Sequence, residues 1–431
     1  DFYRRASWAP DGSVILATTE SQRAHILAVD ASTHTAPRLL HASRSPSPLL
    51  DAVWYPIPAS SVAPHHEGEE EEGREDAVGT TAWCFAESHR DLPIRLTSSV
   101  DGSSRGSYAI MDHVERYIGP HSLAFSPDLS RMYCGVYGGL AVVPLSQPGL
   151  NTHSSLPLSG AKGEGGGQRG IVSALTTTAY AGDSEQELVA VGTYDGTVGI
   201  YAIHPASLPA AADHTATVHN RDEARRIAQR SCLAGWREVE GEGITQLKFH
   251  PALPHILFVA SRKSDHICVY DTRYLFGNTN RWSFRPLLQP SGSNAQRGGA
   301  LLARLYRPGS RTHQRLHFDI DWAGRMLAAG DQDGTIRIWK IDGSRFTDSA
   351  PESESENDED LLLTLEPVLV WQAHADAIGS VSFHPFQPWL LSVSGSRHWP
   401  EAAESSSSED QDQSRKNIWS TRDSSLRIWS F

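Results

Sequence analysis

Apolar and polar residues alternate in short segments along most of the chain, and these segments recur in a fixed order. An apolar segment ends in an aromatic, a small or polar residue and Pro, and two further segments follow, separated by a tight turn. Alternation with a period of two, as in 335–339, is the signature of a half-buried β-strand. The pairs Asp333-Gly334 and Asp195-Gly196 favour tight hairpin turns, since Gly tolerates positive φ. The pattern therefore predicts a repeat of β-hairpins.

The pattern occurs seven times, and units of this kind form the blades of WD-type β-propellers. The seven copies lie at residues 7–30, 52–57 with 92–110, 122–145, 171–203, 244–273, 316–342, and 378–397 with 425–431. The outer fourth strand of a blade is its least regular strand, and candidates for it are 36–42, 233–239 and 365–372. The sequence therefore predicts an all-β, seven-bladed WD40-type β-propeller, in which ring closure removes the exposed sheet edges.

The ends of the chain affect the closure of this ring. The chain stops at the third strand of the seventh unit, and only Asp1–Arg5 precede the first unit. The outer closing strand is therefore expected to be missing or partial. Because the chain opens with Asp1 and not Met, we expect it to be a fragment of a longer and more stable protein.

The whole chain, 1–431, is predicted to be a single propeller domain with insertions of irregular length. The insertions are expected at about 59–81, 146–169, 204–235, 277–313, 343–364 and 400–418. A helix is expected at 219–234, with Asn220 as its N-cap and Glu223 completing a capping box.

The net charge of −13 is concentrated in these insertions. Segments 67–76, 352–360 and 401–412 carry −6, −6 and −5, which leaves about +4 for the remainder. The three segments lack apolar residues, so we expect them to be solvated and disordered insertions. The remaining body is mildly basic, which permits an anionic partner. No apolar run is long enough to span a membrane.

The chain offers no pattern for a metal, a cofactor or a disulfide framework. Its four cysteines, Cys84, Cys134, Cys232 and Cys268, are far apart in sequence, whereas zinc sites and disulfide frameworks need clustered cysteines. The 20 histidines show no ligand spacing. We therefore expect buried reduced thiols and no cofactor.

The last unit contains the residue types of a catalytic triad, with His374, Ser392 and Asp423 close to Trp429. In WD repeats these four positions form a buried hydrogen-bond network. Ser392 lies inside an apolar strand, whereas a nucleophile needs an exposed hydroxyl beside an oxyanion hole. We therefore expect a structural network and no enzyme, and a hydrolase is the disfavoured alternative.

Basic and aromatic residues are predicted to gather on one face of the propeller. Loops that precede the first strand of a unit, and loops between its second and third strands, emerge on the same face. The candidate contacts to RNA or another partner in these loops are Arg169, Arg262, Lys263, Arg311, Arg315, Arg397, His398 and Trp399. The arginines and lysine would contact phosphates, and Trp399 would stack on an unpaired base. The alternative is an unremarkable scatter of surface charges.

Several motifs resemble those of the telomerase Cajal body protein family. They are SWAPDGSVIL at 7–16, HSLAFSPDLSRMYCG at 121–135, RGIVS at 169–173, SRKSD at 261–265, QRLHFDID at 314–321 and SGSRHWPEAAES at 394–405. The last motif is the most specific, because the fold does not require a Ser-Gly-x-Arg-x-aromatic-Pro-Glu run that leads into an acidic insertion. The resemblance covers most of the chain, whose long insertions and weak second unit mark a divergent member.

The resemblance implies a nuclear RNA-binding scaffold. Its expected ligands are small nuclear or Cajal body-type RNAs, namely telomerase RNA, box H/ACA RNA or spliceosomal RNA in mRNA splicing, together with ribonucleoprotein proteins. Its expected role is ribonucleoprotein assembly or localisation, in the nucleus, in a Cajal body-like compartment where one exists, and also in the cytoplasm. Arg262, Lys263, Arg315, Arg397 and Trp399 lie in the matching motifs. We expect a monomer without a membrane or DNA partner. The alternative function is a protein-only propeller that binds peptide partners in a nuclear complex.

Overall fold

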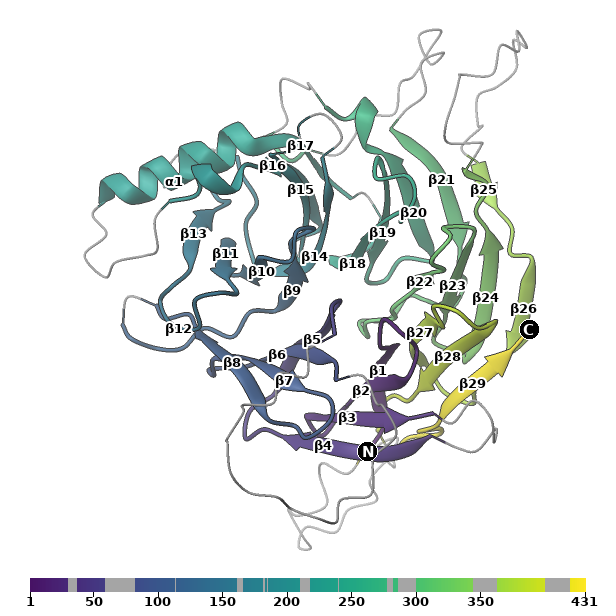
Figure 1. The fold of residues 1–431 in the computed structure, drawn as a ribbon. Coiled ribbons are helices and arrows are strands. Elements are labelled where there is room, and N and C mark those ends of the chain that lie inside the picture. The colour runs from purple at the N-terminus through teal and green to yellow at the C-terminus, as the bar shows by residue number, and fades with distance from the viewer. Residues whose placement is uncertain are drawn as a thin grey trace, which may run out of the picture.

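The structure is a computed structural model, in which seven β-sheets surround a central axis (Figure 1). It describes residues 1–29, 37–58, 82–112, 114–160, 166–180, 183, 185–209, 218–238, 240–276, 282–285, 300–343, 363–399 and 419–431. Each sheet corresponds to one of the seven predicted units, so the prediction of a seven-bladed propeller is confirmed. We number the blades 1 to 7 in chain order.

Within each blade, neighbouring strands are antiparallel and run from the central axis outward. Blade 1 contains β1 (Tyr3–Trp8), β2 (Val14–Thr19), β3 (Arg23–Ala28) and β4 (Arg38–Arg44). Blade 2 contains β5 (Leu49–Tyr55), β6 (Cys84–His89), β7 (Ile94–Ser98) and β8 (Ser104–Ala109). Blade 3 contains β9 (Ser122–Phe125), β10 (Arg131–Val136), β11 (Gly139–Pro144) and β13 (Ser154–Pro157). Blade 4 contains β14 (Val172–Ala179), β15 (Glu187–Thr193), β16 (Thr197–Ile203) and β17 (Cys232–Arg237).

The remaining blades follow the same order, and the last has three strands in the described residues. Blade 5 contains β18 (Ile244–Phe249), β19 (Ile256–Ser261), β20 (His266–Asp271) and β21 (Leu301–Tyr306). Blade 6 contains β22 (Asp319–Ile320), β23 (Met326–Gly330), β24 (Thr335–Lys340) and β26 (Leu369–Gln372). Blade 7 contains β27 (Ile378–Phe383), β28 (Trp389–Ser394) and β29 (Leu426–Ser430), without an outer strand among the described residues.

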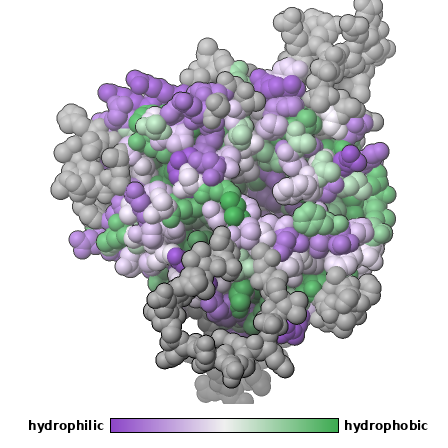
Figure 2. Space-filling model, viewed as in Figure 1, coloured by the Kyte–Doolittle hydropathy of each residue, from purple (hydrophilic) through white to green (hydrophobic). Residues whose placement is uncertain are grey.

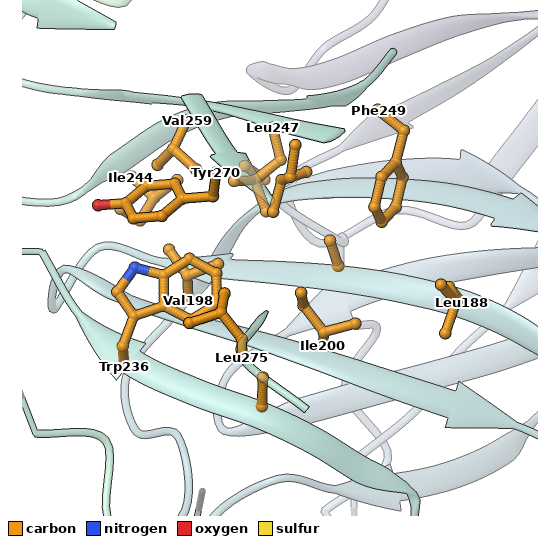
Figure 3. Close-up of a cluster of buried hydrophobic side chains, with 14 of the residues drawn as sticks. Leu188, Val198, Ile200, Trp236, Ile244, Leu247, Phe249, Val259, Tyr270 and Leu275 are labelled. Atoms are coloured by element: carbon orange, nitrogen blue, oxygen red, sulfur yellow. The ribbon is translucent and has the colours of Figure 1, made fainter. Parts of the chain in front are cut away.

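The middle strands are apolar on both sides because each blade packs between two others. All residues of β15 and β19 are buried, so these strands read as continuous apolar runs. Between blades 4 and 5, Val198 and Trp236 face Ile244 and Tyr270 across a shared hydrophobic cluster (Figure 3). Similar clusters lie along the ring, so the core is a set of layers between blades.

Blades 1 and 7 close the ring through their innermost strands. β1 lies against β27 and β28, and the backbone N–H of Ala6 donates to the Ser380 hydroxyl at 2.8 Å. Apolar side chains on both sides of this junction, among them Trp8, Leu391 and Val393, form one buried cluster. The ring is thus held closed by side-chain packing and by hydrogen bonds between the two blades.

Two short strands extend the outer edges of neighbouring blades. β12 (Gly149–Leu150) pairs in parallel with β8 of blade 2, and β25 (Leu363–Leu365) pairs in parallel with β21 of blade 5. Both come from the connection between the third and fourth strands of the following blade. They cover sheet edges that would otherwise present free backbone groups.

Three of the expected insertions also contain the outer strand of a blade. β13 and β21 lie within 146–169 and 277–313, and β17 begins within 204–235 and extends to Arg237. Long connections precede β13 and β21, and these connections hid the two strands in the sequence pattern. The outer strands expected at 36–42, 233–239 and 365–372 are confirmed, since they overlap β4, β17 and β26. The expected insertions at 59–81 and 400–418, and the three acidic segments, lie outside the described residues.

The predicted helix is present as α1 (Val218–Ser231), but its start differs from the prediction. α1 begins two residues before Asn220, so Asn220 lies inside the helix and is not its N-cap. The helix lies at the periphery of the ring, where hydrophilic side chains cover much of the visible surface (Figures 1 and 2). Its inner side is anchored by the buried Ala224 and Ala228. Two 3₁₀ turns, η1 (Pro205–Ser207) and η2 (Thr272–Tyr274), complete the described elements.

Two further findings concern the whole described part of the chain. All four cysteines are buried, and none of them forms a disulfide bond, as predicted. Among the described helices, none has the length and apolar character needed to cross a membrane.

Candidate nucleic-acid interface

The strand order places all eight candidate residues on one face of the ring. Because successive strands of a blade are antiparallel, the loops before the first strand and those between the second and third strands share a face. We call it the upper face; the described residues of its loops include 158–160, 166–171, 194–196, 238, 240–243, 262–265, 307–318 and 395–399. The lower face is formed by the loops between first and second strands, such as 321–325 and 384–388.

The central feature of the upper face is Tyr194, which holds two arginines from other blades. Tyr194 lies in the turn between β15 and β16 of blade 4. The guanidinium carbon of Arg262, from blade 5, lies 4.5 Å from the centre of its ring. That of Arg315, from the loop before blade 6, lies 5.3 Å from the same point, and Arg315 also donates a hydrogen bond to the Tyr194 hydroxyl. The ring thus joins three blades and stabilises both cations by cation–π contact.

Neither of these arginines has a carboxylate partner within the described ranges. Arg262 donates instead to the backbone carbonyl of Glu242 at 3.3 Å, and Arg315 to Tyr194. Both arginine residues are partly exposed. Two like charges therefore share one aromatic ring without neutralisation, an arrangement that an anionic group bound between them would stabilise.

Arginines also act on two histidines of the upper-face loops, His121 and His317. Burial, together with the charges of Arg5, Arg315, Arg4 and Arg307, holds the pKa of His317 well below its usual value. Burial, with Arg315 and Arg90, likewise lowers the pKa of His121. Both histidines are therefore neutral at pH 7, so the positive charge near them comes from the guanidinium groups.

Three of the other candidate cations have carboxylate partners. Lys263 forms an ion pair with Glu242 at 2.8 Å and Arg311 with Asp265 at 2.8 Å, and Arg397 pairs with Glu20. Arg169 is exposed and forms no ion pair with another described residue. A phosphate at the paired positions has to displace a carboxylate, whereas Arg169, Arg262 and Arg315 form no ion pair with a carboxylate of the described residues.

Arg397 and His398 line a pocket of about 790 Å³ at the junction of blades 6, 7 and 1. Its other lining residues include Phe2, Arg4, Glu20, Gln314, Asp376 and Arg422. Trp399 follows directly and exposes 55% of its surface. Arg397 also lies over the ring of Trp419, with 5.5 Å between its guanidinium carbon and the ring centre. The pocket therefore combines cations with nearby aromatic surface.

The buried carboxylate of Asp376 organises this pocket. It accepts hydrogen bonds from the His398 ring at 3.0 Å and from the backbone N–H of Arg422 at 2.9 Å. Burial alone would raise the pKa of Asp376, but the hydrogen bonds from Ser396, Arg422, Ala377 and His398 together lower it. A backbone bridge pairs His398 with Ser420, so Asp376 fixes both sides of the loop that joins β28 to β29.

The four residues of the triad-like set form one hydrogen-bonded chain, in which His374 and Ser392 are buried and Asp423 and Trp429 are partly buried. The His374 Nε2 lies 2.7 Å from the Ser392 hydroxyl, and its Nδ1 lies 3.3 Å from Asp423. The indole N–H of Trp429 donates to the Ser392 hydroxyl at 2.8 Å. Ser392 is closed to solvent, so a substrate cannot reach its hydroxyl. This geometry ties the loop before blade 7 to β28 and β29.

Sequence reasoning missed Tyr194 and Glu20. Tyr194 contacts Arg262 and Arg315, and Glu20 forms an ion pair with Arg397. Tyr194 precedes the Asp195-Gly196 turn, and an aromatic beside a turn pair on the basic face was a usable signal. Glu20 carried no comparable signal, because its partners Arg4 and Arg397 come from the two ends of the chain.

The described residues also contain no group of three or more His, Cys, Asp or Glu side chains that could hold a metal ion.

Comparison with known proteins agrees with this architecture. A model of the WD domain, G-beta repeat, matches residues 313–340 and 365–399, which contain the strands of blade 6 and the first two strands of blade 7. Telomerase Cajal body protein 1 of Mus musculus is 28% identical over 413 residues, covering 94% of this chain and 61% of that protein. The Homo sapiens protein of the same name is 26% identical, covering 94% of this chain and 59% of that protein.

A relative with a different name matches over a similar extent. The guanine nucleotide-binding protein negative regulator 1 of Schizosaccharomyces pombe is 25% identical over 445 residues, covering all of this chain and 88% of that protein. The chain spans about 60% of the length of the telomerase Cajal body proteins that it matches. It is thus a WD-repeat β-propeller and a divergent relative of the telomerase Cajal body proteins, similar to them over nearly its whole length.

Proposed function

We propose that the chain is a non-enzymatic WD-repeat scaffold that binds a small nuclear or Cajal body-type RNA on its upper face. In this role it assists the assembly or localisation of a ribonucleoprotein in the nucleus. The ligand is telomerase RNA, box H/ACA RNA or spliceosomal RNA, and the partners are proteins of the same particle. The names of the telomerase Cajal body relatives support the setting, and the upper face supports the chemistry.

The observation that carries the proposal is the pair of guanidinium groups on Tyr194. Arg262 of blade 5 and Arg315 of the loop before blade 6 lie against one aromatic ring, without a carboxylate partner in the described part of the chain. Guanidinium groups bind phosphates through paired, charge-assisted hydrogen bonds, and a fixed orientation reduces the entropy lost on binding. A phosphodiester between the two cations removes their mutual repulsion. This is a reason for an RNA backbone to bind here.

The other candidates extend this contact along the face. Arg169 lies beside blade 4 and Trp399 beside blade 7, and both are exposed. Lys263, Arg311 and Arg397 exchange their carboxylate partners for phosphates when RNA binds. His398 supports the pocket through Asp376. The chain acts as a monomer, since one face presents the whole set.

The test measures the affinity for single-stranded RNA as a function of salt concentration. We expect the double variant Arg262→Gln, Arg315→Gln to bind more weakly and to lose about 1.4 from the slope of log affinity against log salt, because each contact to a single strand contributes about 0.7. The matched control is Arg325→Gln, an exposed arginine of the lower face. Equal affinity and slope for wild type and double variant would contradict the proposed site.

The class of RNA is tested in cells. Crosslinking of the tagged full-length protein, followed by sequencing of the bound RNA, is expected to enrich telomerase, box H/ACA or spliceosomal RNAs. The enriched class separates a telomerase role from a splicing role. RNA at background level would contradict RNA binding and would favour the protein-only alternative.

One observation on the lower face favours that alternative as a second function. Trp322 of blade 6 and Phe386 of blade 7 expose 79% and 73% of their surfaces there. Exposed aromatics are enriched in protein–protein interfaces. If the double variant Trp322→Ala, Phe386→Ala lost nuclear protein partners but still bound RNA, protein contacts would be assigned to the lower face. Unchanged partners would remove this candidate.

A further inference from the structure

The turn between β10 and β11 of blade 3 exposes a large aromatic side chain on the upper face. Tyr137 occupies this turn and exposes 79% of its surface, more than Trp399. The turn geometry needs only Gly138, whose φ is +67°. The fold therefore does not require an aromatic residue at this position, and nothing in the described core uses it.

A fixed backbone contact brings Arg169 to this tyrosine. Tyr137 forms a backbone bridge with Ile171, and the N–H of Gly138 donates to the carbonyl of Gly170 at 2.7 Å. Arg169 directly precedes this contact and is exposed, without an ion pair to another described residue. The turn of blade 3 and the loop before blade 4 thus present one aromatic ring and one cation together.

The loop that carries Arg169 is rigidly anchored. The buried Gln168 amide donates to the carbonyl of Val191 at 3.0 Å, and its oxygen accepts from the Tyr201 hydroxyl at 2.9 Å. On the other side, Gly170 adopts a φ of +79°, and a Cβ there would lie 2.7 Å from the Asp195 carboxylate. Only glycine permits this close approach.

The anchoring also places this loop beside the guanidinium pair. Asp195 follows Tyr194 directly in the turn between β15 and β16. The loop 168–171 therefore lies between two aromatic residues of the upper face, Tyr137 on one side and Tyr194 with its arginines on the other. Basic and aromatic groups then alternate along the arc from blade 3 to blade 6. Such alternation is the pattern by which proteins hold single-stranded nucleic acid.

We propose that Tyr137 and Arg169 form a binding subsite for one unpaired nucleotide of the RNA, with its base stacked on Tyr137 and its phosphate on Arg169. The neighbouring phosphate lies between Arg262 and Arg315, so the strand follows the arc from blade 3 to blade 6. This inference rests on the proposed function and deepens it, since it selects single-stranded over double-stranded RNA and names the stacking residue.

The test compares matched aromatic variants on the two faces. Tyr137→Ala is expected to weaken the binding of a single-stranded RNA about 5- to 150-fold, the range of base–aromatic stacking. Tyr137→Phe keeps the ring and should bind like the wild type. Trp322→Ala removes an equally exposed aromatic from the lower face and should also leave binding unchanged. Equal melting temperatures for all variants confirm that the fold is intact.

A second readout separates stacking from charge. In Tyr137→Ala the salt dependence should stay that of the wild type, whereas Arg169→Gln should reduce its slope by about 0.7. A series of oligonucleotides, each lacking the base at one position, measures how much affinity each base contributes. At one position, removal of the base should weaken binding to the wild type but not to Tyr137→Ala. That loss of additivity identifies the base stacked on Tyr137.

The outcomes distinguish this subsite from the proposed function. Wild-type binding by Tyr137→Ala, together with weak binding by Arg262→Gln, Arg315→Gln, would overturn the subsite and leave the function. If the affinity losses from base removal and from Tyr137→Ala were additive at every position, the proposed stacking on Tyr137 would be overturned. Absence of RNA binding by the wild type would overturn both.

Discussion

The carboxylate of Glu20, in blade 1, forms an ion pair with the guanidinium of Arg397, in blade 7, across the closure of the ring. The same carboxylate binds Arg4 at 3.1 Å and is itself largely buried. One acidic side chain thus neutralises two arginines at the edge of the upper-face pocket. It competes with any phosphate for Arg397.

Removal of this competitor should strengthen RNA binding. In Glu20→Gln both arginines lose their anionic partner, so we expect a severalfold higher affinity for RNA and a steeper salt dependence. The effect on stability should be small, about 0 to 1 kcal/mol, because Arg4 and Arg397 are half exposed. Fluorescence anisotropy and urea denaturation measure the two quantities.

The control for this experiment is Glu185→Gln, which removes the same charge on the lower face. It should leave the affinity unchanged, since its carboxylate lies near His204 and far from the upper-face loops in the strand order. A fall in affinity in Glu20→Gln, with stability intact, would show that the ion pair positions Arg397 for binding and does not compete with RNA.

Trp399 should contribute to RNA binding through stacking. Trp399→Ala removes an exposed ring beside the pocket, and we expect an affinity loss corresponding to about 1 to 3 kcal/mol. Phe386→Ala, an exposed aromatic of the lower face, is the control and should bind like the wild type. Isothermal titration with a single-stranded RNA checks both. An equal effect of the two substitutions would argue against a specific contact at Trp399.

The hydrogen-bonded chain around Ser392 should contribute to stability. Ser392→Ala leaves the His374 ring and the Trp429 indole N–H without their shared partner, so the free energy of unfolding should fall by about 1 to 3 kcal/mol. Urea denaturation followed by tryptophan fluorescence measures this loss. Ser424→Ala, at an exposed serine of the neighbouring loop, should change little. A Ser392→Ala protein as stable as the wild type would exclude this role.

Stability should depend on pH through buried neutral histidines. Burial, with the nearby Arg95, lowers the pKa of His89 to about 4 from an ordinary value near 6.5. The unfolded chain thus binds a proton at pH values where the folded state does not. The stabilisation from His89 is complete above pH 6.5 and is lost as the pH falls towards 4, by up to about 3 kcal/mol.

Unfolding free energies between pH 4.5 and 8 test this dependence. The wild type should lose stability steadily below pH 6.5, and His89→Asn should show a shallower slope because one titrating group is gone. His317, whose pKa is also depressed by burial and by surrounding arginines, contributes in the same direction. Equal slopes for wild type and variant would show that His89 does not control this range.

Most of the fold could be predicted from the sequence because its signals are local. Alternation with a period of two, together with the Asp195-Gly196 and Asp333-Gly334 turns, is encoded within one hairpin at a time. The outer strands β13 and β21 were harder, because long connections separate them from the hairpins that they join. Asn220 does not mark the start of α1, because the preference of Asn for the N-cap position is weaker than the packing that buries Ala224 and Ala228.

The sequence by itself determined the seven blades and the loop in which each candidate arginine lies, since both follow from strand order within single repeats. Only the tertiary structure decided which of these cations are neutralised. Tyr194 and Arg315 are 121 positions apart, and Glu20 and Arg397 are 377 apart. Their contacts exist because the ring brings neighbouring blades and the two ends of the chain together. The local pattern of apolar and polar residues describes single strands and contains no information about contacts between blades. The ion pairs and cation–π contacts of the upper face therefore follow only from the closed ring.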